Sequence, residues 1–421
     1  MTSLLPIQHN YIKHLSQWEY NLGIVCEFKN GLFYEKDQVK AALTNVVDTQ
    51  EYLHQVYDRE HNKVVCKSAS DLINVEEISM NDSIEACTKY LQKLIGEKSK
   101  RIFKEQNYHI HITLCNTPTK QLFIFVMDHF ISDGASMALT LKLLETRLLH
   151  GQDLPRCILS EKLEPLLMKH RSVDVNELSY WQTKSKNKKE EGPDSYSNKD
   201  QENLVLSLDP ELTKETSTKI KQSKLRFDSL MLSAFQYAFT EVLDKQVGSI
   251  EIAKNLRHYL KLSELFFASG PLVLFFPIRL EQKFDSLEAS YEFIMDQLGQ
   301  VKGKELTYSL LSSEGKIPCY PSKIFYSNMG SLDEFSDMGE IISLSKQIEG
   351  YFHGETFDAN LPCDKDLFIR PYILNGSQVL WISYNSKKYS EDQINQILEL
   401  TLRGFLNILE LESEAKLLSY A

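Results

Sequence analysis

The first half of the chain alternates between short apolar runs and amphipathic stretches. Residues 20–28 ("YNLGIVCEF") form one apolar run, and residues 108–114 ("YHIHITL") and 121–128 ("QLFIFVMD") form two more, separated by the turn-forming residues "CNTPTK". These runs predict strands, the last two as a hairpin. The continuous apolar character of 121–128 is typical of a strand at the centre of a sheet. Residues 35–47 and 83–95 place apolar side chains three or four positions apart, which predicts helices.

The second half of the chain shows the same mixture of periods. A helix is predicted for residues 228–243 and a buried strand for 271–280 ("PLVLFFPIRL"). Further strands are predicted for "SIEIAK", "SKIFYSN", "DLFIRPYIL" and "QVLWISYN", the last two joined by the turn Asn375-Gly376. A final helix begins at Ser390, because Gln393 completes a capping box. This mixture predicts an α+β fold in both halves, each a sheet covered by helices.

The clearest break in composition lies at residues 183–203 ("TKSKNKKEEGPDSYSNKDQEN"). This segment is polar and charged, contains Gly192-Pro193 and has almost no apolar side chain to bury. We therefore predict a linker at 183–203 between an N-terminal lobe, residues 1–182, and a C-terminal lobe, residues 204–421. No sequence repeat relates the two lobes.

The composition excludes several classes of protein. The chain has 421 residues, a formal net charge of −11 and seven Cys residues. The negative charge argues against a general nucleic-acid-binding protein, and the widely spaced Cys residues, without a C-x-x-C pair, indicate a reducing compartment. The N-terminus lacks the apolar core of a signal peptide, and the longest uncharged apolar stretch, residues 265–278, is too short to span a bilayer. We therefore expect a cytoplasmic protein that contacts neither nucleic acid nor membrane.

Residues 125–151 ("FVMDHFISDGASMALTLKLLETRLLHG") place a His between a predicted strand and a predicted helix. His129 follows the strand, and Ser132 or Asp133 can cap a helix after Gly134. A His at the end of a central strand can act as a general base for an amine or hydroxyl. Asp133 could turn away from His129 and pair with a cation elsewhere, pinning the loop. The pattern H-x-x-x-D-G is short, and taken alone it favours a surface His beside an N-cap.

Other chemical features have simpler explanations. His109 and His111 share a strand face and could bind a metal, but no third ligand is evident and a polar sheet face explains them better. His353 and Glu355 could form an acid–base pair, but they fall in a predicted loop. The Lys run at 184–189 is typical of a solvated linker, and alternatively it could contact an acidic carrier protein. We therefore predict no metal site.

Six segments resemble, in the same order, the motifs of the condensation-domain superfamily, which includes the condensation and epimerization domains of nonribosomal peptide synthetases and related acyltransferases. The segments are "LLPIQHNYI" (4–12), "MDHFISDGAS" (127–136), "LSYWQTK" (178–184), "FDSLMLSAF" (227–235), "SGPLVLFFPIRL" (269–280) and "FYSNMGSLDEF" (325–335). Each motif alone is weakly specific. Six of them in order across nearly the whole chain identify it as a free-standing member of this superfamily.

The resemblance implies two chloramphenicol-acetyltransferase-like lobes in a V with a central tunnel. It also implies an acyltransferase with two substrates. A donor thioester would enter one side, on the phosphopantetheine arm of an acyl or peptidyl carrier protein or on coenzyme A. A small-molecule amine or alcohol acceptor would enter the other. No tightly bound cofactor is implied, and we expect a monomer.

The resemblance assigns roles to residues of the motif usually written H-H-x-x-x-D-G. His129 matches the active-site His. Asp133 matches the structural Asp, which pairs with an Arg, and Arg279 in "FFPIRL" is the candidate partner. Gly134 matches the motif Gly, whose small size and backbone N–H face the reacting carbonyl group.

The late motif supplies two further residues. Asn328 in "YSNMG" is assigned to substrate or oxyanion contact, with Ser327 as a weaker substrate-binding neighbour.

The chain departs from the family pattern at three places. Asp128 stands where the active-site motif has its first His. Asp128 is assigned to substrate binding, where its carboxylate could raise the pKa of His129 or repel an anionic acceptor. Alternatively it is a solvated residue at the end of the strand. The early segment that the family writes R-H-x-x-L-R corresponds here to "DTQEYLHQVYD", which contains neither Arg. The forms "PIQ" and "YSNMG" favour the epimerization subgroup, but the Glu of epimerization domains is absent from its expected place in "IAKNLRHYLKLSEL". We therefore rank epimerization below acyl transfer.

The first functional hypothesis is therefore a free-standing condensation-type acyltransferase. It would join a carrier-bound acyl or aminoacyl thioester to an amine, forming an amide in the biosynthesis of a peptide-like natural product such as an antibiotic; an alcohol would give an ester. An alternative is an O- or N-acyltransferase that uses acyl-coenzyme A directly. Another alternative is a catalytically silent domain that only binds carrier proteins. The presence of the matched residues speaks against that last alternative: His129, Asp133, Gly134, Arg279 and Asn328.

Overall fold

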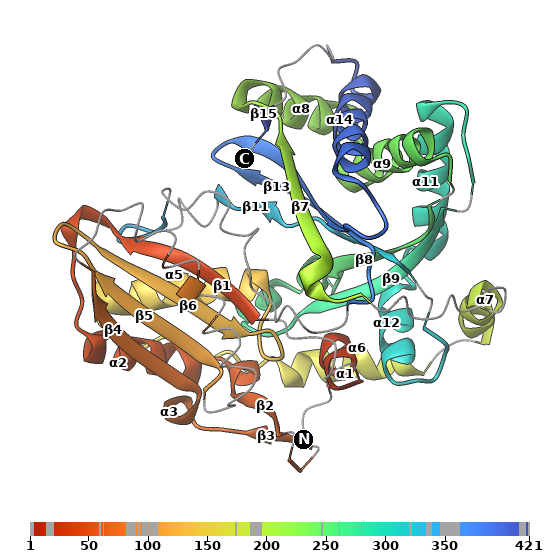
Figure 1. Ribbon diagram of the computed structural model, residues 1–421. Helices are drawn as coiled ribbons and strands as arrows, with labels where there is room; N and C mark the ends of the chain where they lie inside the picture. The colour runs from red at the N-terminus through yellow and green to blue at the C-terminus, as the bar shows by residue number, and fades with distance from the viewer. Residues whose placement is uncertain are drawn as a thin grey trace. The chain divides into compact units, whose positions relative to one another are not determined.

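The structure is a computed structural model with two compact units, each with its own sheet and helices (Figure 1). It describes residues 4–13, 21–58, 60–61, 63–80, 90, 93–94, 97, 108–172, 175–185, 196–245, 247–260, 262–280, 282–319, 322–333, 339–345, 363–411 and 418–419. Unit 1 comprises Met1–His170, Asn255–Val273 and Glu334–Leu361. Unit 2 comprises Arg171–Lys254, Leu274–Asp333 and Pro362–Ala421.

The sheet of unit 1 has five strands in the order β12-β1-β6-β5-β4. The strands are β1 (Asn21–Phe28), β4 (Ile73–Ser79), β5 (Ile110–Asn116), β6 (Gln121–Asp128) and β12 (Ile342–Leu344). Neighbouring strands are antiparallel except for the parallel pair β4 and β5. The predicted hairpin is confirmed, since β5 pairs with β6 along its whole length. β6 is buried at every position, as its apolar run predicts.

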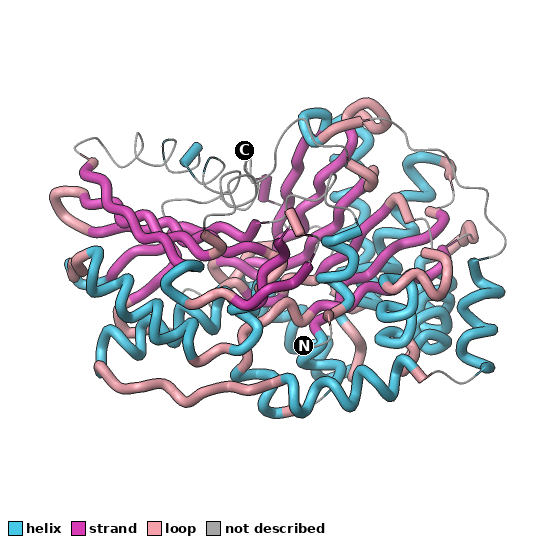
Figure 2. Tube along the Cα trace, turned by 90° about the horizontal axis from the view of Figure 1, so that it is seen from below, coloured by secondary structure: helices cyan, strands magenta, loops and turns pink. Residues whose placement is uncertain are grey.

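Helices α2 (Lys36–Asp48) and α5 (Gly134–His150) contact each other and lie on one side of this sheet (Figures 1 and 2). A capping box between Glu35 and Gln38 starts α2. α5 ends at Gly151, whose φ of 62° is the left-handed conformation that glycine adopts readily. The apolar stripes of both helices join the strands in one core, to which α2 contributes Val39, Leu43 and Val46 and α5 contributes Met137, Leu141 and Leu144.

Shorter elements complete unit 1. They are α1 (Pro6–Lys13), η1 (Lys29–Gly31), η2 (Glu51–His54), the paired strands β2 (Gln55–Asp58) and β3 (Lys63–Cys66), α3 (Ala69–Leu72), α6 (Ser160–Arg171), α10 (Leu256–Leu260) and η4 (Ser263–Phe267). α10, η4 and β12 come from parts of the chain far beyond the other elements of the unit. Unit 1 is therefore built from three separate segments of sequence.

The sheet of unit 2 has eight strands. Seven follow the order β15-β7-β14-β13-β10-β8-β9, and β11 pairs with β13. They are β7 (Gln201–Ser207), β8 (Gly248–Asn255), β9 (Val273–Leu280), β10 (Ile324–Ser327), β11 (Gly330–Ser331), β13 (Leu367–Leu374), β14 (Ser377–Asn385) and β15 (Leu418–Ser419). β10 runs parallel to both β8 and β13, whereas β13 and β14 form the predicted antiparallel hairpin. Its turn residues Asn375 and Gly376 have φ values of 52° and 74°, as a two-residue turn of this type requires.

Helix α9 (Phe227–Leu243) packs between α14 (Glu391–Ile408) and α11 (Leu287–Val301), beside the sheet of unit 2 (Figure 1). The predicted capping box at Ser390 is present. Gly404 permits the close approach of α14 to α9, because a Cβ at this position would lie 3.3 Å from Cβ of Ala234. The remaining elements are α7 (Val175–Ser185), η3 (Asn198–Asp200), α8 (Pro210–Ser223) and α12 (Glu305–Ser313).

The α+β class is confirmed, since both sheets mix parallel with antiparallel pairs and carry helices. The helix predicted at 83–95 lies outside the described residues apart from 90, 93 and 94. Both described ends of the predicted linker are folded, because residues 183–185 belong to α7 and residues 198–203 to η3 and β7. The units also differ from the predicted lobes, since two later segments join unit 1.

Candidate active site

His129 lies in the turn between β6, which ends at Asp128, and α5, which begins at Gly134. Its ring is partly buried, and Nδ1 lies 2.6 Å from the carbonyl oxygen of Ser132. A carbonyl oxygen can only accept a hydrogen bond, so Nδ1 carries a proton in this contact, and in the neutral imidazole the lone pair is on Nε2. In this tautomer Nε2 can take a proton from a nucleophile.

The N-terminal helix α1 supports this turn through Gln8, in the segment "PIQ". The Gln8 side chain is fully buried; its Nε2 donates to the carbonyl oxygen of Phe130 at 3.2 Å, and its Oε1 accepts from the backbone N–H of Leu5 at 3.0 Å. The ring of Phe130 packs edge-on against Tyr11, with 5.4 Å between ring centroids. Sequence reasoning assigned Gln8 no role, although its place in the opening motif was a signal.

Asp128 does not have the substrate-facing carboxylate that the sequence predicts. Its side chain is buried: Oδ2 lies 2.7 Å from Nδ1 of His109, and Oδ1 accepts from the backbone N–H of Phe130 at 2.9 Å. Its backbone carbonyl accepts from the Ser132 hydroxyl at 2.8 Å. A buried carboxylate needs such partners, because an unpaired one would lose its hydration without compensation. The predicted substrate-binding role is therefore replaced by a role in holding the turn.

Asp133 caps α5 and forms a buried ion pair with Arg257. Its Oδ1 accepts from the backbone N–H and the hydroxyl of Ser136, both at 2.7 Å. Its Oδ2 accepts from Nη1 of Arg257 at 2.6 Å and from the backbone N–H of Leu272 at 2.9 Å. The side chains of Asp133 and Arg257 are each 4% exposed. These contacts give Asp133 a structural role that ties the turn to residues 257–272.

The cation beside Asp133 is Arg257 and not Arg279, which corrects the predicted partner. Arg279 lies in β9 in unit 2, where its charge opposes the burial that raises the pKa of Tyr180 to about 12. Arg257 lies in α10, and its Nε and Nη2 also donate to the carbonyl oxygens of Leu265 at 3.1 Å and Ala268 at 2.8 Å. Sequence reasoning did not single out Arg257.

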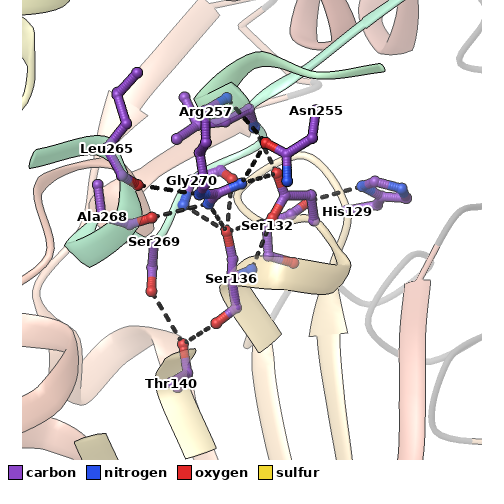
Figure 3. A network of polar contacts seen from close by, with 12 residues as sticks. His129, Ser132, Ser136, Thr140, Asn255, Arg257, Leu265, Ala268, Ser269 and Gly270 are labelled. Atoms are coloured by element: carbon purple, nitrogen blue, oxygen red, sulfur yellow. Dashed lines mark hydrogen bonds and ion pairs between the residues drawn. The ribbon is translucent and has the colours of Figure 1, made fainter. Parts of the chain in front are cut away.

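The Ser136 hydroxyl is the centre of the network in Figure 3. It accepts from Nη2 of Arg257 at 2.9 Å and from the backbone N–H of Gly270 at 2.8 Å. Its single proton lies between two acceptors, Oδ1 of Asp133 at 2.7 Å and the carbonyl oxygen of Gly270 at 2.6 Å. Gly270 also lies close to Tyr52, since a Cβ at position 270 would lie 3.1 Å from Cβ of Tyr52, which would have to shift. Sequence reasoning did not single out Ser136.

Gly134 is the first residue of α5 and is exposed. A Cβ at this position would meet none of the described heavy atoms within 4 Å, so the helix N-terminus is open on that side. Backbone N–H groups at a helix N-terminus favour negative charge. This arrangement suits the contact with a reacting carbonyl group that the resemblance assigns to Gly134, and the assignment stays a prediction.

Asn328 and Ser327 lie in unit 2, where β10 ends. The amide nitrogen of Asn328 donates to Oδ1 of Asp228 at 2.8 Å, and its amide oxygen accepts from the backbone N–H of Gly330 at 2.9 Å. The Tyr326 hydroxyl donates to the same Asp228 oxygen at 2.9 Å, and burial together with this carboxylate raises the pKa of Tyr326. Asn328 is exposed, and its amide nitrogen has a second hydrogen besides the one given to Asp228. The substrate contact that the resemblance assigns to Asn328 stays a prediction.

The two strand histidines have different surroundings. His111 is fully buried, with Nε2 lying 2.7 Å from the Thr113 hydroxyl and Nδ1 lying 3.0 Å from the amide nitrogen of Asn74. Thr113 donates in turn to Glu76 at 2.9 Å, which gives this part of β4 and β5 the polar face that the sequence suggested. His353 and Glu355, and the Lys run beyond residue 185, lie outside the described residues.

The turn can supply a base of fixed tautomer beside a helix N-terminus. A base in this position can deprotonate an amine or hydroxyl, and the N–H groups can stabilise the oxyanion that forms when that nucleophile attacks a carbonyl group. Asp133 already has two donors at each oxygen, so it does not orient the His129 ring as the Asp of a Ser-His-Asp triad does.

Comparisons with known proteins point to one fold. No protein-family model matches the chain. Gramicidin S synthase 1 from Brevibacillus brevis is 21% identical over 97% of this chain, which spans 40% of the length of that relative.

None of the described helices is long and apolar enough to cross a membrane.

Solved structures match nearly the whole chain at low sequence identity. The epimerization domain from the third module of tyrocidine synthetase B has a TM-score of 0.80 and 17% identity, with 97% of both chains covered. The X-domain from teicoplanin biosynthesis has a TM-score of 0.72 and 12% identity, with 97% of this chain and 94% of the other covered. The condensation domain from the Monacolin K polyketide synthase MokA has a TM-score of 0.70 and 11% identity, with 97% of both chains covered. The chain therefore has the fold of the condensation and epimerization domain superfamily, as the six ordered motifs predict.

Proposed function

We propose that the chain is a condensation-type acyltransferase that joins an acyl or aminoacyl thioester to an amine and forms an amide. The observation that carries this proposal is the contact of 2.6 Å between Nδ1 of His129 and the carbonyl oxygen of Ser132, which orients the ring and favours the tautomer in which Nε2 is the basic nitrogen. The buried pair of Asp133 and Arg257 fixes the adjoining start of α5. A base held in this way is prepared for one proton transfer in a defined direction.

In the proposed reaction the amine nitrogen attacks the thioester carbonyl carbon, a C–N bond forms, and an electron pair moves onto the carbonyl oxygen. Nε2 of His129 takes the proton that the amine loses. General base catalysis of this kind raises the reaction rate by about 10²–10⁴-fold. A donor such as the N–H of Gly134 would stabilise the oxyanion by about 3–4 kcal/mol. The intermediate then releases the sulfur, which receives the proton from His129 and leaves as the thiol. We keep Asn328 as a substrate contact in this proposal.

The donor is proposed to be the phosphopantetheine arm of an acyl or peptidyl carrier protein. Coenzyme A ends in the same arm, so an acyl-coenzyme A donor is the nearest alternative, and an alcohol acceptor would give an ester by the same steps. The arm is a substrate here, and no residue is assigned to a resident cofactor. A cytoplasmic location belongs to the same proposal, since it follows from the expected carrier partner.

Epimerization is a second candidate, because the epimerization domain of tyrocidine synthetase B gives a TM-score of 0.80. His129 would then remove the α-proton of an aminoacyl thioester, and a second acid would return a proton to the opposite face. The segment before β9 lacks the Glu at the place where epimerization domains carry it. Glu264, which the segment does contain, forms a surface ion pair with Lys162. Epimerization therefore ranks second.

A carrier-binding domain without catalysis is a third candidate. It is favoured by the match to the X-domain from teicoplanin biosynthesis, a domain also solved in complex with OxyB. The oriented His129 ring argues against this candidate, since a domain that only binds a partner has no need to fix the tautomer of one imidazole.

The decisive experiment offers acyl-carrier protein and acyl-coenzyme A donors with a panel of amines and alcohols, using wild type and His129→Ala. Wild type should transfer the acyl group and His129→Ala should lose about 10²–10⁴-fold in kcat. A fully active His129→Ala would refute the role of the base. Solvent deuterium incorporation at the α-carbon, measured without an acceptor, would instead support epimerization. Carrier binding without either reaction would support the third candidate.

A further inference from the structure

We propose that His109 and Asp128 form a positioning pair that fixes the orientation of the His129 ring. This inference deepens the proposed function, because it rests on His129 as the base. His109 belongs to none of the six motif segments. Asp128 belongs to one, but it departs from the motif pattern there.

The pair is buried and closely bonded where β6 ends. Nδ1 of His109 lies 2.7 Å from Oδ2 of Asp128, and the two side chains are 4% and 7% exposed. A carboxylate oxygen accepts, so Nδ1 of His109 carries a proton in this contact. The backbone joins the same two residues, since the N–H of Asp128 donates to the carbonyl oxygen of His109 at 2.9 Å. The orientation of the Asp128 carboxylate is therefore set from the neighbouring strand.

A continuous path of contacts leads from this pair to His129. Asp128 holds the turn at two points: Oδ1 accepts from the N–H of Phe130 at 2.9 Å, and the carbonyl oxygen accepts from the Ser132 hydroxyl at 2.8 Å. The Ser132 carbonyl oxygen then lies 2.6 Å from Nδ1 of His129. A change in the Asp128 side chain would loosen the Phe130 amide, and with it the turn whose carbonyl orients the ring.

The His109 ring contacts Asp128 through Nδ1. Its other ring nitrogen, Nε2, is buried without a hydrogen-bond partner among the described residues. An Asn at this position could still donate to Asp128, because Asn Nδ2 takes the place of His Nδ1, and it would remove the unpartnered nitrogen. A Leu would remove the donor and leave the Asp128 carboxylate buried without it. His109→Asn is therefore the conservative variant and His109→Leu the disruptive one.

The test measures kcat, KM and the ring tautomer of His129 in wild type, His109→Leu, His109→Asn and Asp128→Asn. The tautomer is measured from the nitrogen shifts of ¹⁵N-histidine-labelled full-length protein, with the His129 signals assigned by their loss in His129→Gln. We expect His109→Leu and Asp128→Asn to lower kcat about 10- to 100-fold, with KM changed less than about 3-fold and the Nδ1–H tautomer less populated. His109→Asn should restore both kcat and the tautomer. Thr113→Val is the matched control, because it disturbs buried contacts of the same strand that do not lead to the turn.

Three outcomes would overturn the inference. The first is an unchanged tautomer and kcat in His109→Leu and Asp128→Asn, which would make the pair merely structural. The second is a loss in His109→Asn as large as in His109→Leu, which would assign the effect to Nε2. The third is an equal loss in Thr113→Val. If His109→Leu does not fold, Asp128→Asn and His109→Asn decide the question. The tautomer is read without substrate, so a wild type that lacks acyl transfer would refute the proposed function while the pair is still tested.

Discussion

The Asp133 carboxylate faces four donors, the backbone N–H and the hydroxyl of Ser136, Arg257 and Leu272, and it shares the hydroxyl proton with the carbonyl oxygen of Gly270. A carboxylate offers about four lone-pair positions, so its accepting capacity is used within this network. The residue acts on His129 only through the chain that it holds. The motif suggested this structural role, but it did not identify which Arg pairs with Asp133. The identity of an ion-pair partner depends on tertiary placement, and no spacing along the sequence distinguishes Arg257 from Arg279.

Replacing Arg257 by Met should destabilise the protein by about 3–5 kcal/mol, because it leaves the Asp133 carboxylate buried without its cation. The measurement is urea unfolding of the full chain, followed by a double-mutant cycle with Asp133→Asn. The cycle should give a coupling energy above about 1 kcal/mol for Asp133 with Arg257. The same cycle with Arg279→Met should give additive effects within about 0.5 kcal/mol.

Lys162→Met is the matched control for a lost ion pair. Lys162 and Glu264 also join two elements of unit 1, but their side chains are 53% and 47% exposed. Solvent screens such a pair, so Lys162→Met should leave the urea unfolding midpoint close to that of wild type. A similarly small effect of Arg257→Met, or strong coupling of Asp133 to Arg279, would contradict the assignment of the counter-ion.

Among the elements, those with a clear period were predictable and those without one were not. The hairpins of β5 with β6 and of β13 with β14 follow from apolar runs separated by turn residues. β12 has only three residues, too few to show a period of two, and it reaches β1 from more than three hundred positions away in the sequence. Contacts at such separation are fixed by packing and not by a local pattern.

Glu145 of α5 holds β12 against the sheet, and its removal should loosen this edge. Oε1 accepts from the backbone N–H groups of Ile341 and Ile342, so Glu145→Ala leaves two amides without their acceptor, at about 1–3 kcal/mol each. Hydrogen exchange should accelerate in residues 342–344 and 26–28, which pair with each other, and should stay unchanged in the pair of β4 and β5.

Glu145→Gln is the control, because its amide oxygen can still accept from the same N–H groups. Gly339→Ala tests the contact from the other side, since a Cβ at this position would clash with Oε2 of Glu145 and must displace it. Exchange in residues 26–28 that stays at the wild-type rate in both Glu145→Ala and Gly339→Ala would show that another contact holds β12.

For the whole molecule, the class of fold was predictable and the composition of the units was not. The sequence suggested one continuous lobe on each side of residues 183–203. Unit 1 instead includes Asn255–Val273, which supplies Arg257, Gly270 and Leu272, and Glu334–Leu361, which supplies β12. The polar composition of 183–203 identified a break between elements, but a break of this kind does not reveal that later segments return to the first unit.

A chain cut at residue 182 should therefore fail to form a stable unit 1. The fragment 1–182 keeps the elements from α1 to α6 and loses the cation of Asp133, the donors from Gly270 and Leu272, and the strand that covers the edge of β1. The Asp133 carboxylate would lack its counter-ion, which destabilises a buried charge. The edge of β1 would be uncovered, and an uncovered edge strand favours aggregation. We expect thermal unfolding of the fragment without a cooperative transition, and association in size-exclusion chromatography.

Asp133→Asn makes this prediction specific to the missing segment, because its effect should change sign between the full chain and the fragment. In the full chain the substitution removes the charge that Arg257 pairs with and should lower the free energy of unfolding by about 3–5 kcal/mol. In the fragment there is no guanidinium to leave unpaired, so removing the charge should leave solubility unchanged or improve it. A fragment that unfolds cooperatively at the temperature of the full chain, or that loses as much stability through Asp133→Asn, would show that unit 1 does not need residues 255–273.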